Sequence, residues 1–91
     1  MENNSMLVRK QNVFTADMNG ETVMMDTEKG KYFNLGAVGG RIWEVLEKKM
    51  TLEELVEILT GEYNIDYDTC LNDVKEFVEK LVSMGLVEIE A

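Results

Sequence analysis

The fold of this chain is decided by residues 31–43, which read KYFNLGAVGGRIW. The segment starts as a short strand, residues 31–35, and passes through a glycine-rich joint into an amphipathic helix. The strand ends an N-terminal β-meander, and no further strand follows directly in the sequence to pair with its free side. An unpaired edge in a small protein is either protected or used to bind another peptide. We favour the second alternative.

Two turns define the meander that leads into this strand. Asn19-Gly20 is typical of a two-residue hairpin turn, because both residues tolerate positive φ angles. The hairpin places Phe14 opposite Met25, and a second turn ends at Gly30, which suits a left-handed position. These turns predict a three-stranded antiparallel sheet with strands over residues 13–18, 21–26 and 31–35.

Hydrophobic periodicity predicts three helices after the sheet. Thr51 and Glu54 form a capping box at the start of the second helix, while Gly61 and Gly85 are expected to end the second and third helices. A short strand follows at the C-terminus. The predicted fold is therefore α+β and winged helix-turn-helix-like, with helices over about residues 37–49, 51–61 and 67–84 and a final strand over residues 87–90.

Length and charge limit what this chain does. Its 91 residues are enough for one domain, over residues 12–91, which we expect to follow a flexible N-terminal lead-in over residues 1–11. The 9 basic and 18 acidic residues give a net charge of −9, which disfavours nucleic acids and anionic membranes as partners and favours cationic ones. The sequence has neither a long apolar run nor a signal-peptide pattern, so we expect a cytoplasmic protein.

The residue types present argue against catalysis and metal binding. The chain has one cysteine, Cys70, and no histidine, so it cannot form an internal disulfide, a zinc site or a Cys–His pair. Its carboxylates recur along helix faces, which a solvated surface explains. We therefore expect no catalytic residue, no metal and no cofactor.

The second and third helices have the spacing of a DNA-binding helix-turn-helix. However, residues 66–84 contain five acidic residues and only two lysines, and such a helix is repelled by phosphates. The glycines of residues 36–40 match neither a Walker loop nor a dinucleotide-binding motif, and are better explained as a joint.

The third helix has a wider apolar stripe than packing requires. Cys70, Val74 and Phe77 extend the stripe toward one side, and a hydrophobic trough results if that side borders the third strand. An extended peptide would then add to the strand edge and place alternate side chains in the trough. Alternatively, residues 6–12 or the tail strand, residues 86–90, cover the edge. The sequence leaves this choice open.

An ordered set of residues resembles the PqqD-like family, the peptide-recognition domains of pathways that modify ribosomally made peptides. The resemblance spans about residues 12–90. Within the family, the chain is similar to the stand-alone leader-binding protein of lasso-peptide clusters or to PqqD itself. The residues that carry it are Asp26, Gly30, Tyr32, Phe33, Leu35, Val38, Gly39, Arg41, Ile42, Trp43, residues 51–55, Tyr63, Asp73, Val74, Phe77, Leu81 and residues 85–87.

The resemblance implies non-catalytic binding of a precursor leader peptide and its presentation to processing enzymes. These partners are a cysteine peptidase and an ATP-dependent cyclase in lasso-peptide pathways, or a radical enzyme in others. In the family, the leader pairs with the third strand and lies against the third helix. The implied contacts are Lys31, Tyr32, Phe33, Asn34 and Leu35 on the strand and Cys70, Asp73, Val74 and Phe77 on the helix. The alternative function is that of a winged-helix protein-interaction domain in a transcription-related protein.

Overall fold

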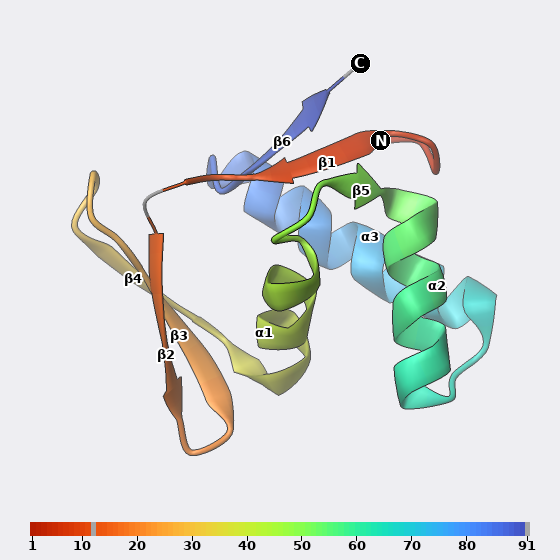
Figure 1. The fold of residues 1–91 in the computed structure, drawn as a ribbon, viewed down its shortest axis with the longest axis horizontal. Coiled ribbons are helices and arrows are strands. Elements are labelled where there is room, and N and C mark those ends of the chain that lie inside the picture. Colours follow the sequence, from red (N-terminus) through yellow and green to blue (C-terminus); the bar gives the residue numbers. More distant parts are fainter. Residues whose placement is uncertain (12, 91) are drawn as a thin grey trace.

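The structure is a computed structural model that describes residues 1–11 and 13–90. It has the predicted α+β fold with three helices and a short C-terminal strand, and its strands form two antiparallel sheets instead of one (Figure 1). The elements are β1 (Met6–Arg9), β2 (Val13–Met18), β3 (Glu21–Asp26), β4 (Lys31–Leu35), α1 (Gly36–Val45), β5 (Met50–Thr51), α2 (Leu52–Tyr63), α3 (Tyr67–Ser83) and β6 (Val87–Glu90).

The predicted meander forms one of two sheets, in the order β2-β3-β4. Phe14 lies opposite Met25, and Gly30 has a φ of +66°, as expected. Met24, opposite Phe33, is fully buried on the face toward the helices. The sequence therefore predicted the strands and both turns of this sheet, and the register of its first strand pair.

The second sheet was not predicted. It has the order β5-β1-β6, with Met6 opposite both Thr51 and Glu90. The expectation of a flexible lead-in over residues 1–11 is thus wrong for Met6–Arg9, which form the central strand of this sheet. Leu7 is fully buried, and its strand partners lie too far along the chain for a local pattern to reveal them.

Two helix boundaries also differ from the prediction. α1 ends at Val45 instead of about residue 49, because residues 50–51 pair with β1. α2 continues through Gly61 to Tyr63, and its C-cap is Asn64, with a left-handed φ of 53°. Gly61 therefore lies inside α2, and the helix ends at Asn64 instead.

The caps predicted at Thr51 and Gly85 are confirmed. Thr51 Oγ1 accepts a hydrogen bond from Glu54 N at 3.1 Å, and Thr51 N donates to Glu54 Oε1 at 3.1 Å. At the end of α3, Leu86 N donates to Leu81 O at 2.9 Å while Gly85 has a φ of +76°, the arrangement of a glycine-terminated helix. None of the helices in residues 1–11 and 13–90 combines the length and apolar character needed to cross a bilayer.

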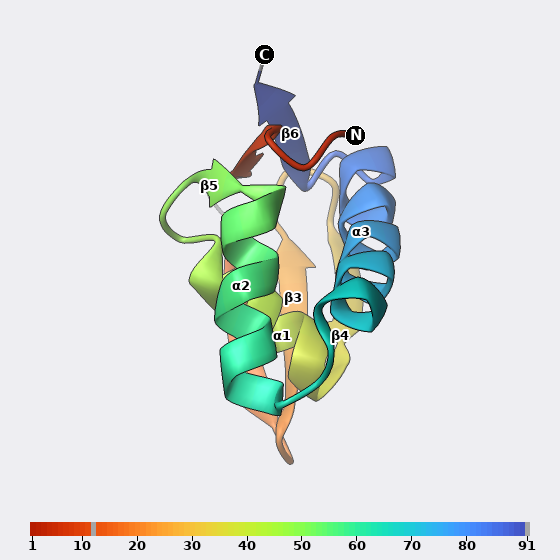
Figure 2. The same ribbon diagram turned by 90° about the vertical axis from the view of Figure 1, so that its right-hand side faces the viewer.

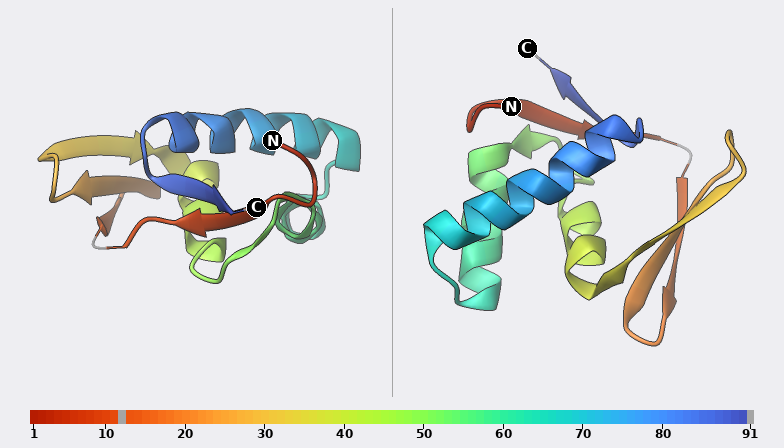
Figure 3. Two further views of the ribbon diagram at one scale, coloured as in Figure 1. Left: turned by 90° about the horizontal axis from the view of Figure 1, so that it is seen from above. Right: turned by 180° about the vertical axis from the view of Figure 1, so that it is seen from behind.

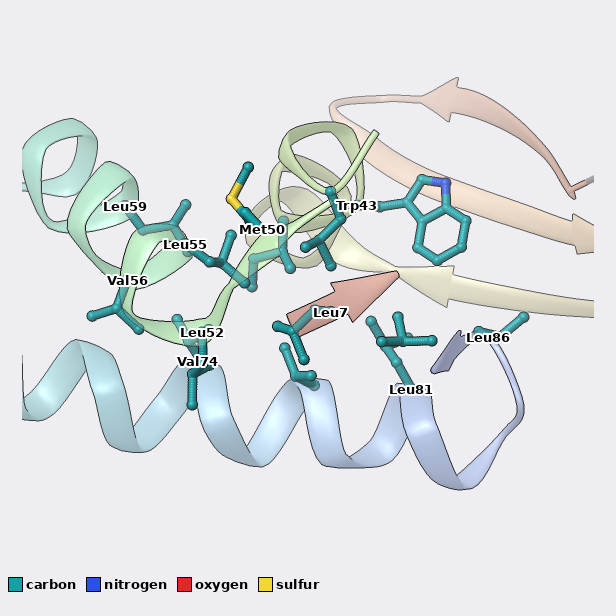
Figure 4. Close-up of a cluster of buried hydrophobic side chains, with 14 of the residues drawn as sticks. Leu7, Trp43, Met50, Leu52, Leu55, Val56, Leu59, Val74, Leu81 and Leu86 are labelled. Atoms are coloured by element: carbon teal, nitrogen blue, oxygen red, sulfur yellow. The ribbon is translucent and has the colours of Figure 1, made fainter. Parts of the chain in front are cut away.

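The hydrophobic core lies where the second sheet meets the three helices. Leu7 of β1 lies in the middle of the side chains that α2 and α3 contribute, and Trp43 of α1 closes one end (Figure 4). The Arg9 guanidinium lies 5.1 Å from the centre of the Trp43 ring and donates a hydrogen bond to Trp43 O at 2.8 Å. β1 is therefore fixed both by burial and by this contact.

α1 packs closely against the first sheet, which lies behind it in Figure 2. Gly40 makes this possible, because a Cβ atom at that position would lie 2.0 Å from Thr22 Oγ1 and 2.5 Å from Thr22 Cβ. The glycine thus lets the helix backbone come within contact of β3.

Gly40→Ala is expected to lower the free energy of unfolding by about 1–3 kcal/mol, because the added methyl group overlaps Thr22. Gly61→Ala is the matched control: nothing lies within 4 Å of its Cβ position, so this change should raise stability by about 0.5–1 kcal/mol. Urea unfolding of both variants measures the difference. Equal stability of Gly40→Ala and the natural chain would contradict the close approach.

Asp26 connects the end of β3 to the segment between the two sheets. Its Oδ2 accepts a hydrogen bond from Lys10 Nζ at 3.2 Å, and its Oδ1 accepts from Glu28 N at 3.0 Å and Lys29 N at 3.3 Å. Burial by itself raises the pKa of Asp26, but the hydrogen bonds outweigh burial and leave the pKa below its ordinary value. The ionised form is therefore the one that stabilises the fold.

Because its folded-state pKa is lowered, the contribution of Asp26 is complete above the ordinary carboxyl pKa and is lost as the pH falls through the folded-state value. Asp26→Asn should thus lower the melting temperature at neutral pH, and the difference from the natural chain should shrink in acid. Glu79→Gln, at an exposed position on α3, is the control. A difference that does not change with pH would show that the charge of Asp26 is unimportant.

Candidate functional site

The outer edge of β4 has no strand partner among the residues that the structure describes. β4 is the last strand in the order β2-β3-β4, while β1 and β6 pair with each other in the second sheet. Residues 6–9 and 87–90 therefore do not cover the β4 edge, which was the alternative that the sequence left open. Residue 12 lies outside the described residues. β4 is the edge on the side of α3, and β2 lies farther from that helix (left view of Figure 3).

An apolar hollow of about 450 Å³ lies where the end of β4 and the start of α1 face α3. Phe77 forms part of its wall and lies directly against α1, because a Cβ atom on Gly39 would lie 2.6 Å from Phe77 Cζ. The described residues of its lining are Leu35, Gly36, Ala37, Val38, Gly39, Ile42, Asp73, Val74 and Phe77. Among these, Asp73 is the one charged residue.

A second apolar hollow of about 290 Å³ adjoins the first. It lies between the start of α1, the end of α2 and the first half of α3. Val38, Asp73 and Val74 belong to both hollows, so the two adjoin, and together they are called the groove. The remaining residues of the second lining are Leu59, Tyr63, Ile65 and Cys70.

The structure brings the predicted helix-side contacts together. Asp73, Val74 and Phe77 line the first hollow, and Cys70 lies in the floor of the second. Cys70 is only 2% exposed, and its thiol lies 3.9 Å from Val56 O. Burial raises the pKa of the Cys70 thiol, and this favours the unreactive protonated form.

The predicted strand residues divide between the edge and the two sheet faces. Leu35 lines the first hollow, whereas Lys31, Tyr32, Phe33 and Asn34 line neither hollow. Tyr32 is 70% exposed on the face away from the helices, where it lies beside Phe14 and Met25. If these four residues contact a peptide, they therefore do so mainly through the backbone edge.

The contribution of α1 to the hollow was not predicted from the sequence. Gly36, Ala37, Val38, Gly39 and Ile42 line the first hollow, but were interpreted only as a joint and a helix start. Adjacent glycines at a helix start were the available signal, since such glycines often permit a close approach of another chain segment.

Comparison with known proteins places the chain in a family. The model of the family described as coenzyme PQQ synthesis protein D (PqqD) matches residues 21–87. The chain belongs to the PqqD family. Among solved structures, this PqqD-family chain is similar to TbiB1 in complex with the TbiA(beta) leader peptide. The two are 34% identical with a TM-score of 0.79, and the match covers 92% of this chain and 98% of TbiB1. No curated protein matches the chain.

The residues matched by the PqqD model contain the whole groove. They run from β3 to the start of β6, and so include every residue that lines either hollow. β1 lies outside the match, although it is the central strand of the second sheet. The family resemblance is therefore concentrated in the part of the fold that builds the groove.

Proposed function

We propose that this PqqD-family chain binds the leader segment of a ribosomally made precursor peptide without catalysing a reaction on it. The observation that carries the proposal is an open strand edge, β4, ending in an apolar groove against α3. TbiB1, which resembles the chain over nearly all its length, forms a complex with a leader peptide. The chain thus presents its peptide to other enzymes of the pathway.

The edge and the groove have different roles in binding. An added strand forms main-chain hydrogen bonds with β4, and these bonds supply affinity without depending on the peptide sequence. Alternate side chains of an extended peptide then point toward the same side, where Leu35 and Phe77 offer an apolar surface. Selectivity arises from which side chains fill that surface.

The proposal requires no chemistry from this chain. Residues 1–11 and 13–90 contain no group of three or more potential metal-binding side chains, and the one cysteine is buried. The modifying steps therefore belong to partner enzymes. We infer that these are a cysteine peptidase with an ATP-dependent cyclase, or a radical enzyme, and that the winged helix-turn-helix-like fold serves peptide binding instead of DNA binding.

Phe77→Ala is expected to weaken peptide binding by more than about 1 kcal/mol, because a half-buried ring leaves the wall of the groove. The probe, titrated by calorimetry, is a synthetic peptide with the leader sequence of a precursor gene to be sought beside the gene for this chain. Phe14→Ala is the matched control, since Phe14 is 65% exposed on the opposite face of the sheet and lines neither hollow.

Backbone amide shifts in the same titration locate the peptide. Residues 32–35 and residues around Val74 and Phe77 should shift together as the peptide pairs with β4. Flat shifts in both regions would overturn the proposed function. Equal affinities of Phe77→Ala and the natural chain would overturn the placement of the side-chain groove.

A further inference from the structure

The second hollow has the form of an unfilled side-chain site. Its floor is buried, with Leu59 at 1%, Cys70 at 2% and Val74 at 4% exposure. Its rim, in contrast, is exposed to solvent. Val38 on the rim is 51% exposed, and two further rim residues, Tyr63 and Ile65, are also exposed. Large apolar side chains around a buried apolar floor indicate a surface that gains stability when a ligand covers it.

These two further rim residues, Tyr63 and Ile65, are each 42% exposed and belong to a segment with a fixed backbone. Asn64 between them ends α2 in a left-handed conformation, and its N–H donates to Thr60 O at 3.0 Å. Asp66 then caps α3 by accepting a hydrogen bond from Thr69 N at 3.0 Å. The rim is thus held in place on both sides, and a ligand pays little to order it.

Asp73 lies on the border between the two hollows. It lines both, and it is the one carboxylate among the described residues of the two linings. It is exposed, so its charge is available to a ligand that passes from one hollow to the other. With a net charge of −9 on the whole chain, this border favours a cationic group.

We propose that one peptide occupies both hollows, with a large apolar side chain in each and a basic residue between them that faces Asp73. This inference rests on the proposed function, because the peptide that pairs with β4 reaches the second hollow through the first. The three residues that the hollows share place both within reach of one peptide, which is why the same peptide is assigned to both. A hollow of about 290 Å³ is at the small end of ligand sites, which suits one side chain better than a cofactor.

The first experiment selects peptides without assuming a sequence. A displayed library of random peptides of about 12 residues, long enough to follow β4 and cross both hollows, is enriched on the natural chain. Enriched peptides should share two large apolar positions separated by a short interval that contains lysine or arginine. Enrichment of peptides with a single apolar anchor would overturn the inference and leave the proposed function intact.

The second experiment uses one enriched peptide and matched isoleucine variants. Ile65→Thr should weaken its binding about fivefold to tenfold, the scale expected when one or two methylene-sized groups lose their contacts. Ile89→Thr is the control, because Ile89 is also 42% exposed but lies on β6, away from both hollows. Equal effects of the two changes would overturn the inference.

Amide shifts distinguish this failure from failure of the proposed function. Shifts in β4 and in residues 63–65 support both. Shifts in β4 alone, with unchanged binding by Ile65→Thr, overturn only the second anchor. Shifts in residues 63–65 without shifts in β4 overturn both, because one continuous peptide is required.

A charge exchange tests the role of Asp73. The library is enriched again on Asp73→Lys, and the residue between the two anchors should change from basic to acidic. Glu79→Lys makes the same change in net charge on α3 but at a residue that lines neither hollow, and should leave the preference basic. An unchanged preference with Asp73→Lys would show that Asp73 does not select the ligand.

Discussion

The pairing of β1 with β6 is the constraint on which the groove depends. It ties the two ends of the chain to each other in a sheet that also includes β5. Leu7, fully buried beneath that sheet, makes the pairing part of the core instead of a loose association of termini. Because both ends are used there, neither provides the strand that would complete the first sheet at β4.

The groove itself is produced by the glycine-rich joint. Gly40 lets α1 approach β3, and Gly39 lets the Phe77 ring lie on the backbone of α1. Side chains at either position would push the helix away from its neighbours, and the wall of the first hollow would lose its shape. The same short segment thus connects the open edge to the apolar surface beside it, so an added strand meets both at once.

The sequence predicted what depends on neighbours a few residues apart. The hairpin at Asn19-Gly20, the capping box at Thr51 and the glycine end of α3 all follow from local hydrogen bonding, and all are present. β1 was missed because its partners lie at residues 50–51 and 87–90, and four residues carry no periodicity that reveals such distant pairing. Gly61 was misread for a related reason: Asn64 offers an alternative left-handed end three residues later, and one more turn of helix brings Tyr63 to the second hollow.

The helix side of the site was inferred from two kinds of signal, and its contacts with a peptide remain predictions. Val74 and Phe77 follow from the width of an apolar stripe, which a sequence displays directly, whereas Asp73 came from the resemblance to the PqqD-like family. The part contributed by α1 was not visible, because glycines show that something approaches closely without showing what.

The division between a backbone edge and an apolar groove has a consequence for how such a protein chooses its ligand. Hydrogen bonds from β4 are available to any extended peptide, so the edge alone does not discriminate. One apolar hollow adds little selectivity, since many peptides contain one large apolar residue. Two joined hollows with a carboxylate on their border demand a spacing and a charge together, and a peptide that lacks either leaves apolar surface or Asp73 without a partner. On the proposed function, a small acidic domain thereby has the means to recognise one peptide among many.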